Sequence, residues 1–193
     1  MTFRGWDKNI AAIVSLAASP PVLAIVAMVI QARQSFEPGV WSWVWLHAVL
    51  AVIIPMAYLV QLVRRGRVGD IDIETREERF SPLGVTVVCT GVAWLVFYFR
   101  GAPTPMTVLA GVLFAQTAII FATTFFWKIS VHCASAGLAG ILASGLTGSA
   151  VPAVVTVTPM SWSRWRLDQH TPAQAVAGTL LGVLASVVVG ALG

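Results

Sequence analysis

Residues 172–192 read PAQAVAGTLLGVLASVVVGAL and contain no charged side chain. A helix needs about 20 mostly apolar residues to cross the hydrocarbon layer of a membrane, so this run predicts a membrane-spanning helix. The rest of the chain is similar: of 193 residues, 58% are hydrophobic and 10% are charged, whereas soluble domains carry about 25% charged residues. We therefore predict an all-α, polytopic transmembrane bundle that forms a single domain over residues 1–193.

Further apolar runs precede this one, and together they predict six to seven membrane helices. They cover Ile10–Gln31, Trp41–Val63, Leu83–Phe99, Pro105–Trp127, Val131–Thr147 and Val151–Trp162. The last of these is short and contains Pro152 and Pro159, so a kinked or partly interfacial helix is the alternative to a full crossing. The first run is too long for a cleaved signal sequence, and we expect a retained helix.

Prolines and hydroxyl residues predict where several helices begin or bend. Ser81-Pro82, Thr104-Pro105 and Thr171-Pro172 each combine a hydroxyl cap with a proline suited to the first turn. Pro20-Pro21 and Pro55 lie inside apolar runs and predict kinks. Small-residue packing between helices is expected at Gly137, Gly140, Gly145, Gly148, Gly178 and Gly182.

Charge predicts the orientation, because short cytoplasmic loops are enriched in Lys and Arg. If seven helices cross, ten of the twelve basic residues lie on one side, and only Arg33 and Arg100 lie on the other. The basic side is then cytoplasmic, in a cell inner or plasma membrane. Trp41, Trp43 and Trp45 are expected to anchor the chain at the opposite interface.

The polar chemistry is concentrated near the end of the chain. Lys128-Ile-Ser130-Val-His132 offers an ammonium group, a hydroxyl and an imidazole, with Lys128 and His132 expected one helical turn apart. Ser163-Arg164 and, more weakly, Arg166 precede His170, which stands directly before the run at 172–192. The free backbone amides of a helix start bind anions, so this pattern predicts a pocket for a phosphate group.

These two segments resemble the signatures of the type 2 phosphatidic acid phosphatases. The family's Pro-Ser-Gly-His is similar to Ile129-Ser130-Val131-His132. The family has a further signature, which consists of Ser-Arg, five residues, His, three residues and Asp. Residues 163–174 are similar to it, with Gln174 in place of the aspartate. The resemblance implies that His170 attacks phosphorus, His132 protonates the leaving oxygen, Ser130 and Arg164 hold the phosphoryl oxygens, and no cofactor or metal is needed.

The family's remaining signature, Lys, six residues, Arg-Pro, is missing. Arg79 occupies the position of its arginine and Asp72 that of its lysine. Arg76 and Arg79 could supply cations to the phosphate, with Lys128 in the role of the lysine. The alternative is a solvated loop in which these arginines pair with Glu74, Glu77 and Glu78. Gln174 could accept the ring N–H of the nucleophile but brings no charge, and Asp168 is a second candidate for that orienting role.

The expected activity is metal-independent hydrolysis of a lipid or isoprenoid phosphate or diphosphate in the bilayer, without a nucleic-acid partner. Two alternatives remain open. A scaffold of weak or no activity would bind a lipid phosphate, and a Mg²⁺-dependent prenyltransferase-like enzyme would use Asp70, Asp72 and Glu74. His47, alone in an apolar run, is expected to be a hydrogen-bonded packing residue, and Cys89 and Cys133 to be buried, unbridged thiols.

Overall fold

The computed structural model of the chain describes residues 3–35, 37–73 and 75–193. Helices dominate this part of the chain, and it contains no β-strand. The helices form two compact units. The first combines the described residues up to Ile30 with Lys128–Ala191, and the second covers Gln31–Trp127 together with the last two residues.

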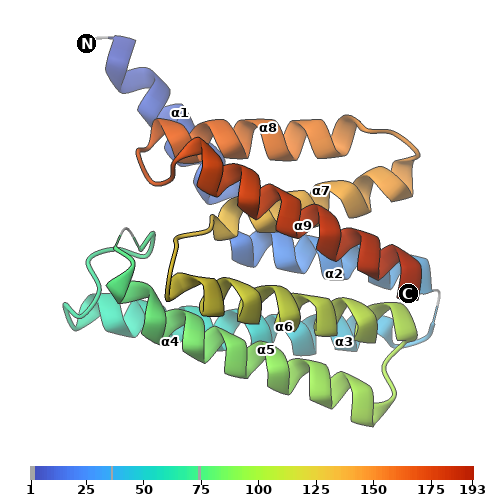
Figure 1. The fold of residues 1–193 in the computed structure, drawn as a ribbon. Helices are drawn as coiled ribbons and strands as arrows, with labels where there is room; N and C mark the ends of the chain where they lie inside the picture. The colour runs from blue at the N-terminus through green and yellow to red at the C-terminus, as the bar shows by residue number, and fades with distance from the viewer. Residues whose placement is uncertain (1–2, 36, 74) are drawn as a thin grey trace. The chain divides into compact units, whose positions relative to one another are not determined.

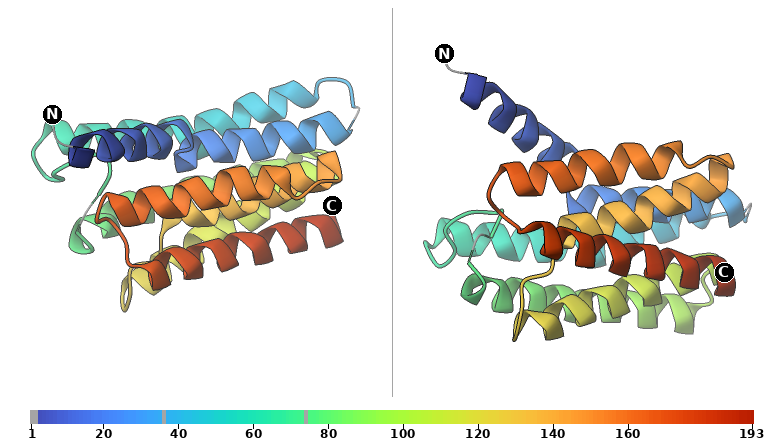
Figure 2. Two further views of the ribbon diagram at one scale, coloured as in Figure 1. Left: turned by 90° about the horizontal axis from the view of Figure 1, so that it is seen from above. Right: turned by 45° about the horizontal axis from the view of Figure 1, so that its top comes forward.

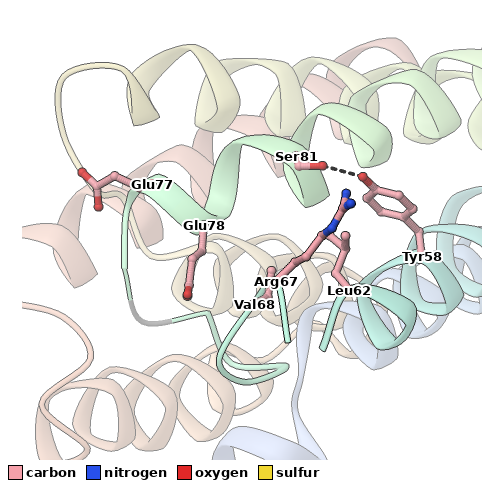
Figure 3. Close-up of a pocket in the computed structure, with 7 residues that line it drawn as sticks. All are labelled: Tyr58, Leu62, Arg67, Val68, Glu77, Glu78 and Ser81. Atoms are coloured by element: carbon pink, nitrogen blue, oxygen red, sulfur yellow. Dashed lines mark hydrogen bonds between the residues drawn. The ribbon is translucent and has the colours of Figure 1, made fainter. Parts of the chain in front are cut away.

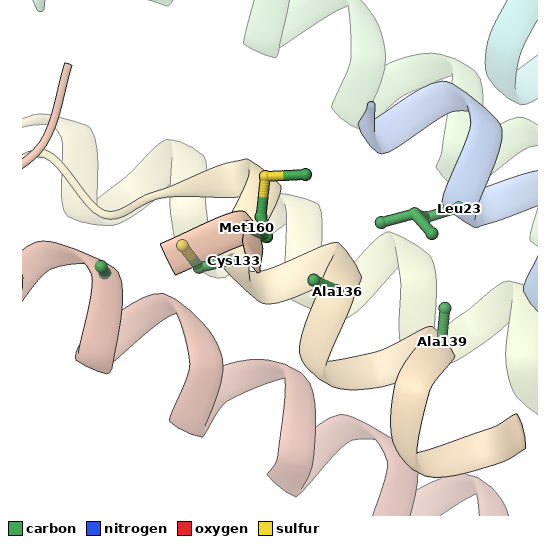
Figure 4. Packing of buried hydrophobic residues seen from close by; sticks show 6 residues of the cluster. Leu23, Cys133, Ala136, Ala139 and Met160 are labelled. Atoms are coloured by element: carbon green, nitrogen blue, oxygen red, sulfur yellow. The ribbon is translucent and has the colours of Figure 1, made fainter. Parts of the chain in front are cut away.

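The first unit contains α1 (Phe3–Ala17), most of α2 (Pro20–Ser35), α7 (Val131–Thr147), α8 (Val151–Arg166) and α9 (Pro172–Leu192). α8 packs along both α7 and α1, and α7 and α8 run side by side in each view (Figures 1 and 2). Its core is built from small and flexible side chains, which let the helices approach closely. The cluster contains Leu23, Cys133, Ala136, Ala139, Met160 and Ala175 (Figure 4).

Glycines bring α7 and α9 into direct backbone contact. A Cβ atom at Gly137 would lie 2.8 Å from the carbonyl oxygen of Thr179. A Cβ at Gly182 would clash with the carbonyl oxygen of Ala134, and one at Gly178 would clash with that of Ser130. Small-residue packing is therefore confirmed here and at Gly140, whose Cβ would meet Thr156. The prediction of small-residue packing is wrong for Gly145, which faces open space, and for Gly148, which ends α7 with φ 64°.

The second unit contains α3 (Val40–His47), a π-helical segment η1 (Ala48–Ile53), α4 (Ile54–Arg64), a short 3₁₀ turn η2 (Glu77–Arg79), α5 (Phe80–Arg100) and α6 (Thr104–Thr124). α5 and α6 form an antiparallel pair (Figure 1). The π-helix lies immediately before Pro55, whose ring cannot donate a backbone hydrogen bond. The kink predicted at Pro55 is thus a change of helical pitch within one continuous segment, Val40–Arg64.

Four helical segments of the described chain are long and apolar enough to cross a membrane: Val40–Arg64, Glu77–Arg100, Thr104–Thr124 and Pro172–Leu192. A fifth crossing arises if Trp6–Ala17 and Pro20–Ser35, bent by 44° at the break before Pro20, form one broken span. An integral membrane protein is indicated, with fewer spans than the six to seven predicted. α7 has only 17 residues, about 26 Å of helix against a hydrocarbon layer of about 30 Å.

Two of the predicted helix caps are wrong. α5 begins at Phe80, after η2, so Ser81 lies inside the helix and its hydroxyl bonds instead to that of Tyr58, at 2.5 Å. α6 begins at Thr104, so Thr104 is the first helical residue and Pro103, not Thr104, occupies the cap position. Thr171 does cap α9, because its Oγ1 accepts a hydrogen bond from Gln174 N at 3.3 Å. A residue before proline is restricted in conformation but need not be a cap.

The isolated histidine and the tryptophans of the second unit are only partly as expected. His47 is 1% exposed and packs edge-on against Phe97, with 6.1 Å between ring centroids. Neither of its ring nitrogens has a hydrogen-bond partner among the described residues, so the packing is confirmed and the hydrogen bond is not. Trp43 also packs on Phe97, whereas Trp41 and Trp45 face outward, as residues of an interfacial belt would.

Candidate functional site

The two polar segments near the end of the chain meet in the first unit. Lys128 Nζ donates a hydrogen bond to the carbonyl oxygen of Gln169, at 3.0 Å. The backbone N–H of Ser130 donates to the carbonyl oxygen of Gln174, at 3.3 Å. These contacts join the start of α7 to the turn between α8 and α9. Six of the eight predicted site residues belong to this unit: Lys128, Ser130, His132, Arg164, His170 and Gln174.

The first segment is extended up to Ser130, and α7 begins only at Val131. Ser130 is completely buried, and its Oγ caps the helix by accepting a hydrogen bond from Cys133 N at 3.3 Å. His132 lies in the first turn of α7 and is half-buried. Lys128 therefore does not share a helical face with His132 as predicted, because it lies outside the helix and reaches toward Gln169.

His170 is held in a turn that is fixed at both ends. On its N-terminal side α8 ends in a Schellman motif, in which Gln169 N donates to Arg164 O at 3.1 Å and Asp168 N donates to Trp165 O at 3.1 Å. His170 N also donates to Arg164 O, at 3.2 Å. On the C-terminal side α9 begins immediately after Thr171. The backbone that carries the imidazole therefore has little conformational freedom, and His170 is only 5% exposed.

Gln174 forms a capping box with Thr171 and also contacts the imidazole. Its Oε1 accepts a hydrogen bond from Thr171 N at 3.1 Å, while its own backbone N–H donates to Thr171 Oγ1. The same Oε1 lies 3.3 Å from His170 Nδ1. Because a backbone N–H can only donate, this side-chain atom is the oxygen, and it accepts a hydrogen bond from His170 when Nδ1 carries the ring proton. In that tautomer of the neutral ring the lone pair is on Nε2, the atom that would act as a nucleophile.

Asp168 does not take the orienting role suggested for it. Its carboxylate accepts a hydrogen bond from Lys8 Nζ at 3.2 Å, and both side chains are well exposed. Its backbone adopts φ 59°, a left-handed conformation at the position where glycine usually ends a Schellman motif.

Asp168→Gly is therefore expected to stabilise the protein by up to about 1 kcal/mol, because it relieves the left-handed strain. The exposed ion pair with Lys8 contributes too little to offset this gain. Thermal unfolding of the purified protein in detergent would measure the change. Asp168→Ala is the control, since it removes the same ion pair but keeps the strain, and it should not be stabilising.

Helix α1 supplies polar partners to the end of α8 that sequence reasoning missed. Arg164, with no exposed surface, donates from Nη1 to Ser15 Oγ at 2.6 Å. Ser163 Oγ donates to the carbonyl oxygen of Ala11 at 2.6 Å, and Arg166 pairs with Asp7 at 2.7 Å. Nothing in the sequence marked Ser15 as a partner, since 149 positions separate it from Arg164.

The remaining predicted residues, Arg76 and Arg79, belong to the second unit. Arg79 is 6% exposed and donates from Nε and Nη2 to the carbonyl oxygen of Ile73, at 3.2 and 3.0 Å. Arg76 pairs with Glu77 at 3.5 Å. The Arg76–Glu77 pair is of the kind expected in the alternative without phosphate binding, whereas Arg79 is buried and bonds to the backbone rather than to a glutamate. Glu74, which that alternative and the Mg²⁺ alternative both used, lies outside the described residues.

Groups of three or more His, Cys, Asp or Glu side chains suited to a metal ion do not occur in the described parts of the chain. Cys89 and Cys133 are both free thiols; Cys133 is buried as predicted, whereas Cys89 is only half-buried.

No protein-family model matches the chain, and comparison with curated proteins and with solved structures gives no match.

Proposed function

We propose that the protein is a membrane phosphatase that removes a phosphate, or the terminal phosphate of a diphosphate, from a lipid or isoprenoid. The observation that supports this most is the contact between the start of α7 and the turn before α9. Through Lys128–Gln169 and Ser130–Gln174, it gathers basic, hydroxyl and imidazole groups in one unit. Phosphoryl transfer requires a nucleophile and positive charge around the phosphoryl oxygens, and little else from a protein.

In the proposed reaction, Nε2 of His170 attacks phosphorus and the bond from phosphorus to the lipid oxygen breaks. His132 gives its proton to that departing oxygen. Water then attacks the phosphohistidine, with His132 taking a proton from it, and free phosphate leaves. Lys128, Ser130 and Arg164 are assigned to the phosphoryl oxygens. No bound metal takes part in these steps.

Gln174 is the orienting residue in this proposal. As a neutral acceptor it selects the tautomer of His170, but it cannot stabilise the positive charge that develops on the ring during attack. A hydrogen bond to a carboxylate is roughly twice as strong as one between neutral groups. We therefore propose a slow enzyme whose nucleophile is oriented but not electrostatically assisted.

Gln174→Glu is expected to raise the rate of phosphate release about five- to tenfold, because glutamate suits the same capping position and adds the missing charge. Gln174→Ala is the matched variant: it should lower the rate and destabilise the protein by about 1 kcal/mol through loss of the cap. Initial rates and thermal unfolding distinguish the two contributions. A Gln174→Glu protein no faster than the parent would contradict the proposed role.

The test of the function is a panel of lipid phosphates presented in detergent micelles. It would include phosphatidic acid, phosphatidylglycerophosphate, a prenyl diphosphate and a phosphoribosylated polyprenol, each assayed for released phosphate with Mg²⁺ and with EDTA. Release that survives EDTA supports the proposal. Activity only with Mg²⁺ would favour the prenyltransferase-like alternative, and binding without release would favour the scaffold.

The proposed site lies at the cytoplasmic face of a cell inner or plasma membrane, and α7 and α8 add to the four or five spans as short crossings. This follows from the basic residues assigned to that side. The substrate's tail would lie among apolar helices while its phosphate approaches the N-terminal ends of α7 and α9.

A further inference from the structure

The second unit contains a pocket that the proposed phosphatase reaction does not use. It lies where α4 ends and α5 begins, which are the adjoining ends of two candidate membrane spans, Val40–Arg64 and Glu77–Arg100. Its volume is about 250 Å³. Since a water molecule occupies about 30 Å³ in the liquid, the pocket would hold a lipid headgroup but not a whole lipid.

The lining combines an apolar floor with polar walls of both charges. Leu62 and Val68, both buried, belong to the apolar cluster of this unit. The polar lining residues are Tyr58, Arg67, Glu77, Glu78 and Ser81. In Figure 3 the Arg67 side chain extends to the side of the pocket where the bonded hydroxyls of Tyr58 and Ser81 lie, whereas Glu78 points to the opposite side.

These charges decide which ligand fits. An anionic headgroup would find one guanidinium and two hydroxyls, but it would also face the carboxylate of Glu78; the carboxylate of Glu77 pairs with Arg76. A simple cation would face Arg67. A zwitterion avoids both penalties, because its phosphate accepts hydrogen bonds from Arg67, Tyr58 or Ser81 while its ammonium donates to Glu78. A quaternary ammonium has no N–H to donate and is usually held by several aromatic rings, of which this pocket has only Tyr58.

We propose that this pocket binds the headgroup of a phospholipid with a primary ammonium group, of the phosphatidylethanolamine type. Its phosphate contacts Arg67, its ammonium contacts Glu78, and its glycerol end lies against Leu62 and Val68. The site is independent of the proposed phosphatase activity, and the lipid is bound there without being cleaved.

Native mass spectrometry of the full chain, released from micelles containing equal amounts of phosphatidylethanolamine, phosphatidylcholine and phosphatidylglycerol, tests this proposal. The parent protein should retain phosphatidylethanolamine about tenfold more than either competitor, as expected for one hydrogen bond to a charged group. Glu78→Gln should lower the retention of phosphatidylethanolamine to that of phosphatidylcholine. Arg67→Ala should reduce retention of phosphatidylethanolamine itself.

Two variants serve as controls, because they change the same residue types at exposed positions outside the pocket: Arg65→Ala and Glu37→Gln. Both should keep the preference, and the thermal unfolding of all four proteins should agree within a few degrees. Equal retention of the three lipids by the parent protein would overturn the proposal. So would a preference for phosphatidylglycerol, which would mark a simple anion site, or a preference that survives both Glu78→Gln and Arg67→Ala.

Discussion

Alanine in place of His170 is expected to lower phosphate release from a lipid phosphate by on the order of 10³-fold or more, since the variant lacks the proposed nucleophile. The parent protein, incubated with substrate labelled in its phosphate, should also carry label on one histidine. An alkaline denaturing quench is required, because a phosphorus–nitrogen bond on imidazole hydrolyses in acid. The label should be absent from His170→Ala. In His132→Ala the label should accumulate only if proton transfer by His132 is needed mainly for the second step, the hydrolysis of the phosphohistidine.

His47→Leu provides the matched control, because it removes a histidine from the second unit, in a part of the chain given no role in the reaction. It should retain full activity. It should also be at least as stable as the parent, since leucine replaces a buried ring whose nitrogens have no partner among the described residues. Unchanged activity in His170→Ala would rule out the phosphohistidine mechanism, whatever the behaviour of the control.

Gly182→Ala is expected to destabilise the protein by about 1–3 kcal/mol, because a single methyl group at this position would clash with the carbonyl oxygen of Ala134. The helices α7 and α9 would have to separate, and their N-terminal ends carry His132 and, just before α9, His170. Activity should therefore fall together with stability. Thermal unfolding in detergent and phosphate release would be measured on the same preparations.

Gly190→Ala in the same helix is the control, since a Cβ there meets nothing within 4 Å. It should be neutral or stabilising by up to about 1 kcal/mol through helix propensity. Equal effects of the two substitutions would show that the close approach of α7 and α9 at Gly182 does not contribute to stability.

Local sequence predicted most helix boundaries well. The bounds expected for α7 and α9 match those observed, and the bend at Pro20 lies where the proline pair predicted it. Long apolar runs and proline act over a few residues, so their effects are visible in the sequence itself. Only four or five of the predicted spans meet the length and composition of a membrane-spanning helix, because the run 10–31 lies in two bent helices and because α7 and α8 are short.

In the candidate site, too, some features follow from local sequence and others depend on tertiary contacts. The spacing of Ser163, Arg164, His170 and Gln174 is local, and the cap formed by Thr171 could be anticipated from the proline that follows it. That Gln174 serves both as a capping residue and as the acceptor facing His170 depends on side-chain geometry in the folded turn. Lys128 does not share a helical face with His132, because α7 begins only at Val131, and its contact with the carbonyl oxygen of Gln169, 41 positions away, leaves no local signal in the sequence.

The sequence by itself determined that this is a helical membrane protein, where most of its helices lie, and which polar side chains stand at the ends of its apolar runs. Those properties depend on composition, on apolar run length and on backbone preferences over a few residues. The tertiary structure alone decided that Ser15 would bind Arg164, that α9 would contact the start of α7 through Gly178, and that Arg79 would fold its own loop. Such contacts join residues whose separation along the chain leaves no local trace, and they form only when whole helices pack.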